Sequence, residues 1–204
     1  MAEAVSAVLL DFGGVIAEEG FREGLYALAG EQGLDPEWLA QEGMDAVYDS
    51  GYVTGEGAEA GFWALLRNRT GLRGSDERLR QHILARFIVR PEMIELVDRL
   101  RRSGHLIGLL SDQTDWIELL DREQHFLNHF DILFISYRMG KGKRDASLFG
   151  DVAQHLKLPP KEILFIDDNP ENVERAESQG MRGMVFVDQR SLGQRLRDEL
   201  GLRF

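Results

Sequence analysis

Five short apolar segments, each followed by a polar or turn residue, constrain the fold of this 204-residue chain more than any other feature. Hydrophobic residues are continuous within each segment, which is typical of strands buried on both faces of a parallel sheet. Segments with helical spacing lie between several of them, such as 91–102, where Met93, Val97 and Leu100 recur on one face. This alternation predicts a doubly wound α/β domain. The predicted strands are residues 5–10, 106–110, 132–135, 163–166 and 184–187.

Residues 17–88 interrupt this alternation. They contain no convincing strand, and helical patterns occupy residues 21–32, 37–48, 57–69 and 76–87. An insert of about 70 residues is too long for an ordinary crossover between strands. The sequence therefore predicts an α/β core of residues 1–16 and 89–204, and a small all-helical cap of residues 17–88 inserted after the first strand.

The chain is acidic, because its 24 Lys and Arg residues against 35 Asp and Glu residues give a net charge of −11. Affinity for nucleic-acid phosphates depends on fields of Lys and Arg, so we expect no nucleic-acid partner. An anionic small substrate meets the same repulsion. A site that handles phosphate in this chain therefore needs a local cation.

Three features bear on the location of the protein. Cysteine is absent, which excludes disulfides, thiol catalysis and thiolate metal sites and favours a reducing compartment. No run of about 18 consecutive apolar residues occurs, so we expect no membrane span. Residues 1–15 lack the basic region of a signal peptide. We expect a cytoplasmic protein without a membrane partner.

Polar side chains follow the ends of the predicted strands. Asp11 follows the first strand, Ser111 follows the second, and Asp167 and Asp168 follow the fourth, whereas the loop after the third strand is rich in Lys and Arg. In open parallel sheets, ligands bind beyond the carboxyl ends of the strands. A carboxylate, a hydroxyl, an ammonium group and an acidic pair are therefore predicted to converge on one crevice.

Four motifs at these strand ends resemble those of the haloacid dehalogenase-like (HAD) hydrolase superfamily. They are DFGGV at residues 11–15, LLSD at 109–112, GKGKRD at 140–145 and FIDDNPEN at 165–172. Each motif is weak by itself, but four in the right order make the resemblance specific, and it covers nearly the whole chain. The resemblance implies a Rossmann-like core and a helical cap like that of the phosphatase and dehalogenase branches.

The resemblance implies a role for each motif. Asp11 is the expected nucleophile, which attacks phosphorus and forms an aspartyl phosphate. Mg²⁺ is the expected cofactor, held by Asp11, Asp168 and the backbone carbonyl of Gly13. Asp167 and Asn172 are expected to orient these ligands. Simpler roles compete: Asp11 as a solvated carboxylate at a strand end, and the acidic pair as part of a helix cap.

The phosphate group is expected to meet three further residues. The hydroxyl of Ser111 and the backbone N–H of Asp112 donate hydrogen bonds to the transferring phosphoryl oxygens. Lys143 neutralises the charge of the nucleophile and of the phosphoryl group. Lys141 lies two residues away and competes for this role, and a solvated basic loop is the simpler interpretation of both.

The sequence departs from the family pattern at Gly13. Phosphatases of this superfamily usually carry an Asp there, two residues after the nucleophile, which protonates the leaving oxygen. Such a catalyst contributes a factor of about 10² to 10⁴. Water, a cap residue such as Glu18 or Glu19, or an easily departing leaving group are the alternatives in this chain.

Three functions are compatible with the sequence. The first is an Mg²⁺-dependent phosphatase that acts on a small phosphorylated metabolite. The second is a catalytically silent protein that binds a phosphorylated ligand or a protein partner. The third is a haloacid dehalogenase, which expels halide and needs no Mg²⁺, so the pair of Asp167 and Asp168 argues against it. We favour the first, and the identity of the metabolite depends on cap geometry.

Overall fold

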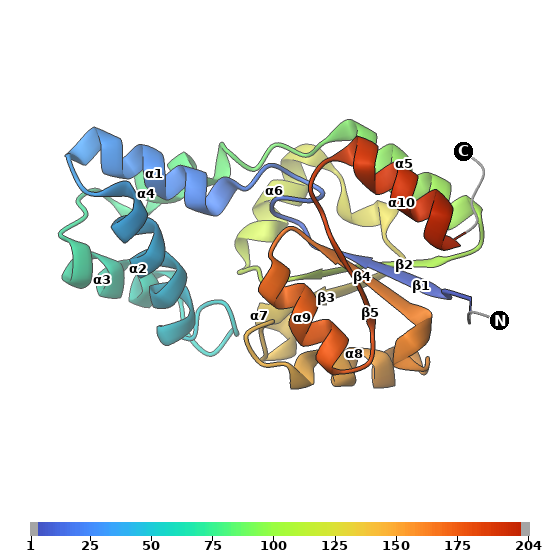
Figure 1. The fold of residues 1–204 in the computed structure, drawn as a ribbon. Coiled ribbons are helices and arrows are strands. Elements are labelled where there is room, and N and C mark those ends of the chain that lie inside the picture. The colour runs from blue at the N-terminus through green and yellow to red at the C-terminus, as the bar shows by residue number, and fades with distance from the viewer. Residues whose placement is uncertain (1–3, 201–204) are drawn as a thin grey trace.

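A computed structural model describes residues 4–200, so the ends of the predicted core, residues 1–3 and 201–204, lie outside the described part. Five strands form one parallel sheet in the order β3-β2-β1-β4-β5. The predicted doubly wound α/β architecture is therefore confirmed (Figure 1). The strands are β1 (Ala7–Leu10), β2 (Leu106–Ser111), β3 (Ile132–Ile135), β4 (Ile163–Asp167) and β5 (Arg182–Val185).

Helices cover both faces of the sheet (Figure 1). One face packs against α5, α6 and α10, and the other packs against α8 and α9. The central strands therefore have no face toward water, which explains their continuous hydrophobic sequences. The core helices are α5 (Pro91–Arg102), α6 (Trp116–Gln124), α7 (Ser136–Met139), α8 (Ser147–Leu156), α9 (Pro170–Ser178) and α10 (Gln189–Leu200), with the 3₁₀ turns η1 (Leu127–His129) and η2 (Pro160–Glu162).

The fifth strand differs from the prediction of residues 184–187. It begins at Arg182 and ends at Val185, where it pairs with Asp167 of β4. A Cβ on Gly183 would lie 2.4 Å from Val173 Cγ1, so glycine allows α9 to approach β5 closely. The hydrophobic pattern did not predict the start of this edge strand, because Arg182 and Gly183 contribute backbone pairing and close packing rather than apolar surface.

Four helices lie between β1 and α5 and stand beside the sheet at the left of Figure 1. They are α1 (Gly20–Gln32), α2 (Pro36–Asp49), α3 (Glu59–Thr70) and α4 (Asp76–Leu84). Their apolar faces bury one another, with Leu25, Leu39, Phe62 and Ile83 withdrawn from solvent. We refer to residues 17–88 as the cap; the limits of the cap and of the core stay predictions.

Two connections join the cap to the core side by side. Ala17 forms an antiparallel bridge with Val89, and Arg90 N donates a hydrogen bond to Ile16 O at 2.9 Å. Beyond this crossing, Phe12 stacks between the rings of Phe87 and Phe126. The entry to the cap is therefore anchored directly beside the end of β1.

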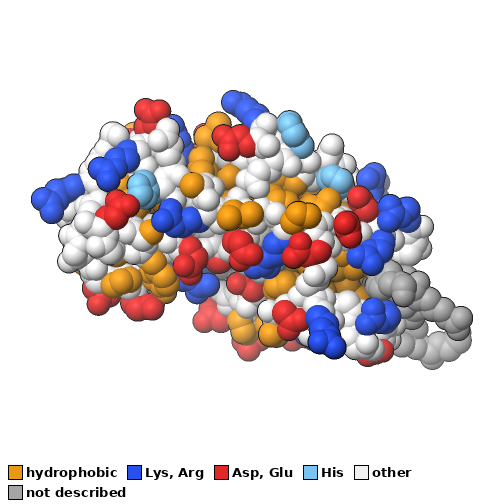
Figure 2. All heavy atoms as spheres, turned by 90° about the horizontal axis from the view of Figure 1, so that it is seen from above, with side chains coloured by type: hydrophobic (Ala, Val, Ile, Leu, Met, Phe, Trp, Pro, Cys, Tyr) orange, Lys and Arg blue, Asp and Glu red, His pale blue; other side chains and the backbone are white. Residues whose placement is uncertain are grey.

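The outer surface carries mixed charge. On the face in Figure 2, acidic and basic side chains are interspersed, and apolar side chains lie along its middle. Several of the charged groups form exposed ion pairs, such as Arg101 with Asp131 at 2.7 Å. Among the described residues, no helix is long and apolar enough to cross a membrane.

Candidate active site

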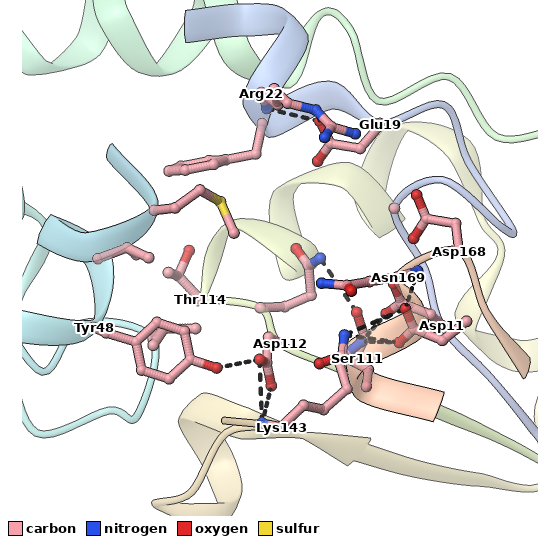
Figure 3. A pocket seen from close by; sticks show the side chains of 18 of the residues that line it. Asp11, Glu19, Arg22, Tyr48, Ser111, Asp112, Thr114, Lys143, Asp168 and Asn169 are labelled. Carbon is pink, nitrogen blue, oxygen red and sulfur yellow. Dashed lines mark hydrogen bonds and ion pairs between the residues drawn. The ribbon is translucent and has the colours of Figure 1, made fainter. Parts of the chain in front are cut away.

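The carboxyl ends of three adjacent strands bring polar side chains together. Asp11 follows β1, Ser111 is the last residue of β2, and Asp167 is the last residue of β4. All three are buried, and they face a cavity of about 400 Å³ beneath the cap (Figure 3). The predicted crevice is thus present, and residues of α1, α2 and the following loop close it from above.

Lys143 lies at the centre of this cluster. Its Nζ is 2.8 Å from Asp11 Oδ1 and 2.6 Å from Asp167 Oδ2, and its side chain is only 3% exposed. Lys141 instead points away, where its Nζ donates to Ser147 Oγ at 2.9 Å and pairs with Asp151. Geometry therefore selects Lys143 over Lys141 as the cation of the site.

The charges of the cluster depend on one another. Burial opposes the charged form of Lys143, but Asp11, Asp167 and Asp112 outweigh it and raise the lysine pKa above its usual value. Burial raises the pKa of Asp11 to about 7, against the opposing effect of Lys143. The single positive charge of Lys143 therefore does not balance the negative charges of the carboxylates, and the cluster would attract a further cation.

Three carboxylates could share such a cation. Asp11, Asp167 and Asp168 each offer an oxygen, and these oxygens lie within 4.8 Å of one another. Asp11 is buried, and Lys143 Nζ, 2.8 Å from its Oδ1, is a cation that it shares with Asp167. Burial, followed by the charge of Asp167, raises the pKa of Asp168. Hard oxygen donors with unsatisfied negative charge suit Mg²⁺.

Asp168 also depends on its neighbour across the site. Gly14 has a φ of +80°, and a Cβ there would lie 2.3 Å from Asp168 Oδ2. Only glycine adopts this backbone readily and leaves space for the carboxylate. The second glycine of the DFGGV motif is therefore required by the position of Asp168.

Asp167 is fixed more firmly than Asp168. It is fully buried, and it accepts hydrogen bonds from Asn169 N at 2.8 Å and from Asn172 Nδ2 at 3.2 Å, besides its pair with Lys143. Asn172 is itself held by Arg175 at 2.9 Å. With its oxygens engaged in this way, Asp167 is suited to hold Lys143 and α9 in place, which supports the expected orienting role of Asp167 and Asn172.

Asp112 has a partner that sequence reasoning missed. Its carboxylate accepts the backbone N–H of Lys143 at 2.9 Å and also the hydroxyl of Tyr48 from cap helix α2 (Figure 3). Tyr48 thus lines the cavity from the cap. The two residues are 64 positions apart, so no local pattern connects them.

Three other aromatic residues of the cap pack against the core. Tyr52, Phe62 and Trp63 are buried in the cap. Their rings surround Trp116 of core helix α6, at centroid distances of 5.8 to 6.1 Å. This aromatic cluster holds the cap against the core on one side of the cavity.

The two candidate acids beside Gly13 have different surroundings. Glu18 forms an exposed pair with Arg90, 2.8 Å between Oε2 and Nη2. Glu19 lines the cavity, and its Oε1 would lie 3.8 Å from a Cβ built on Gly13. Burial raises the pKa of the Glu19 carboxyl. Glu19 therefore places its carboxyl group beside the position where the usual family acid would begin.

Gly13 itself is not constrained by space. A Cβ there would meet Phe87 Cε1 at 3.5 Å, an ordinary contact, and its φ lies outside the left-handed range. Glycine at this position is therefore not required by the backbone, in contrast to Gly14.

Comparison with known proteins gives a consistent result. The model of the haloacid dehalogenase-like hydrolase family matches residues 5–180. The chain is 30% identical over 106 residues to flavin mononucleotide hydrolase 1 of Arabidopsis thaliana, which covers 52% of this chain and 43% of that protein. It is 31% identical over 126 residues to phosphoserine phosphatase of Thermus thermophilus, covering 56% and 49%. The matches therefore span about half or less of these curated relatives.

A solved structure shares the fold. It is a HAD family enzyme from Bacteroides thetaiotaomicron in complex with magnesium and inorganic phosphate, with a TM-score of 0.72 at 23% identity, covering 93% of this chain and 99% of that one. This likeness supports the fold, and the family match over most of the sequence confirms the resemblance carried by the four motifs. The chain belongs to the haloacid dehalogenase-like hydrolase family.

Proposed function

We propose that this hydrolase is an Mg²⁺-dependent phosphatase that acts on a small phosphorylated metabolite through an aspartyl phosphate on Asp11. The observation that carries the proposal is the position of Lys143, buried between Asp11 and Asp167 beside a third carboxylate, Asp168. A buried nucleophile with its own cation and a set of oxygen ligands is suited to phosphoryl transfer.

The residues present fit a magnesium ion. Asp11, Asp168 and the backbone carbonyl of Gly13 would hold it, because these groups offer the oxygen donors that Mg²⁺ prefers. When bound, the ion offsets the negative charge of the carboxylate and phosphate that must meet in the reaction. Asp167 is already engaged by Lys143, Asn169 and Asn172, so its part is to fix the arrangement.

The reaction divides into two displacements. An oxygen of Asp11 attacks phosphorus, the bond from phosphorus to the ester oxygen breaks, and the leaving alcohol takes up a proton. Water then attacks the phosphorus of the aspartyl phosphate and gives up a proton, which restores the acid used in the first step; the bond to Asp11 breaks, and inorganic phosphate leaves. The Ser111 hydroxyl and the Asp112 N–H would bind the phosphoryl oxygens, and Lys143 would offset their charge.

The proton for the leaving alcohol is assigned to Glu19. Glu19 lines the cavity next to Gly13: its Oε2 accepts the backbone N–H of Arg22 at 2.8 Å, and its Oε1 faces Gly13. Glu18 does not line the cavity and is paired with Arg90. Its pKa is raised by burial, which favours the protonated form that a general acid requires. Glu19 thus takes the place of the aspartate that the family usually carries two residues after the nucleophile.

Further support comes from the curated relatives, one named as a flavin mononucleotide hydrolase and one as a phosphoserine phosphatase. Their substrates differ, so the names favour phosphate-ester hydrolysis and do not select one metabolite. A dehalogenase is disfavoured, because it needs no metal and leaves the acidic trio without a task. The proposal includes a cytoplasmic location.

The test is phosphate release from a panel of phosphorylated metabolites, with Mg²⁺ and with chelator. We expect turnover that requires Mg²⁺ and is lost in Asp11→Asn. Calorimetry should show weaker Mg²⁺ binding in Asp168→Asn and unchanged binding in Asp198→Asn, an exposed control on α10. Phosphate-ester binding without turnover would favour the silent binding protein, and equal Mg²⁺ affinity in Asp168→Asn would overturn the metal assignment.

A further inference from the structure

Part of the cavity wall is apolar. Six hydrophobic side chains form it, and they come from cap helices α1 and α2, the loop after α2, the chain before α5, and core helix α6. We call them the apolar wall. They are Phe21, Met44, Val47, Val53, Phe87 and Trp116.

Three polar side chains beside this wall each have a hydrogen-bond partner within the protein. The Tyr48 hydroxyl donates to Asp112, and Gln113 Nε2 donates to Ser111 Oγ at 3.3 Å. Thr114 Oγ1 accepts the backbone N–H of Trp116 at 3.3 Å. Hydroxyl groups of a substrate that lie against the six apolar side chains would lose their hydrogen bonds with water without replacement, which costs about 1 to 3 kcal/mol for each group left unpaired.

We infer that the natural substrate is a phosphate monoester of an apolar alcohol, aryl or alkyl, whose body lies against the apolar wall while its phosphate lies between Ser111 and Lys143. This inference rests on the proposed phosphatase function. A cavity of about 400 Å³ is near the small end of ligand pockets, so the apolar body is small.

A second anionic group on the substrate is disfavoured. Arg22 is the cation that the cap contributes to the cavity, and half of its side chain is exposed. Glu19 lies 3.6 Å from its guanidinium, and Asp168 faces the same end of the cavity. An additional anion would therefore meet two carboxylates along with the one arginine.

The test compares two esters of six-carbon primary alcohols, hexyl phosphate and sorbitol 6-phosphate, which differ in their hydroxyl groups. We expect kcat/KM to be at least tenfold higher for hexyl phosphate. Along the series from ethyl to hexyl phosphate, each methylene that reaches the wall should raise kcat/KM about two- to fourfold. Equal or better turnover of sorbitol 6-phosphate, or of a substrate with a second anion such as a bisphosphate, would overturn the inference and leave the phosphatase proposal intact.

Matched variants locate the preference on the wall. Met44 and Trp38 are both on α2 and similarly exposed, at 39% and 42%, but only Met44 lines the cavity. Met44→Gln should lower the preference for hexyl phosphate several-fold, whereas Trp38→Gln should leave it unchanged. Equal effects of the two variants would mean that the wall does not select the substrate.

Binding separates this inference from the phosphatase proposal. If no ester is hydrolysed, the proposed function fails, and the wall is still tested by calorimetry of the two esters with the Asp11→Asn protein. Tighter binding of hexyl phosphate there would support the inference. Equal or tighter binding of sorbitol 6-phosphate would overturn it.

Discussion

The hydroxyl of Tyr48 in the cap donates a hydrogen bond to the carboxylate of Asp112 in the core, at the wall of the cavity (Figure 3). The same carboxylate accepts the backbone N–H of Lys143 at 2.9 Å. Burial raises the pKa of Tyr48, and the charge of Asp112 adds to this effect, so the phenol remains the donor throughout the neutral range. One carboxylate thus connects the position of the cap with the loop that carries Lys143.

Tyr48→Phe should therefore weaken both stability and substrate binding. Loss of a hydrogen bond to a partly buried carboxylate costs about 1 to 3 kcal/mol of unfolding free energy. Urea denaturation measures this loss, and KM should rise more than kcat falls. Tyr26→Phe is the control, because Tyr26 bonds to Glu37 at 2.8 Å on the exposed surface of the cap. Equal stability losses in the two variants would contradict the connection between cap and core.

Lys143→Met and Lys141→Met should behave differently. Lys143 is buried between two carboxylates, so its removal leaves charge uncompensated and should cost about 3 to 5 kcal/mol of stability and all detectable turnover. Lys141 pairs with the exposed Asp151, and its loss should change stability by less than about 1 kcal/mol. Thermal unfolding and phosphate release measure both effects. Full activity of Lys143→Met would exclude it from the site.

Gly14→Ala should displace Asp168. A Cβ would lie 2.3 Å from the Asp168 carboxylate, and the φ of +80° adds strain. Gly33→Ala is the matched control, since Gly33 has a φ of +69° with no atom within 4 Å of the added Cβ. The control should lose about 1 to 2 kcal/mol from backbone strain alone. Calorimetry should show weakened Mg²⁺ binding in Gly14→Ala but not in Gly33→Ala, and unchanged binding in both would refute the argument.

The sequence predicted the elements that depend on local pattern. Strands buried on both faces, such as β1 and β4, have continuous apolar sequences, and the polar residue at each strand end was found with them. The edge strand β5 was misplaced, because Arg182 and Gly183 carry no hydrophobic signal. Contacts between distant segments could not be predicted from local sequence patterns. No periodicity indicates that Lys143 rather than Lys141 faces the acids, or that Tyr48 bonds to Asp112.

Gly13 stands where the family usually carries an acid, and Glu19 lies beside it. If Glu19 protonates the leaving oxygen, Glu19→Gln should slow hydrolysis of hexyl phosphate by a factor of about 10² to 10⁴. Phenyl phosphate has a better leaving group and should be affected far less. Glu18→Gln is the control, because Glu18 pairs with Arg90 away from the cavity.

The pH profile and a rescue variant make this test specific. A general acid acts in its protonated form, so the contribution of Glu19 to the rate is present below its pKa and is lost as the pH rises through that pKa. Burial raises the pKa of Glu19, which extends the active pH range to higher pH. Glu19→Gln should remove this limb of the profile. A Cβ at position 13 would meet no atom closer than 3.5 Å, so Gly13→Asp added to Glu19→Gln should restore much of the rate on hexyl phosphate. If the rate of the Glu19→Gln variant does not depend on the acidity of the leaving group, the proton comes from another group.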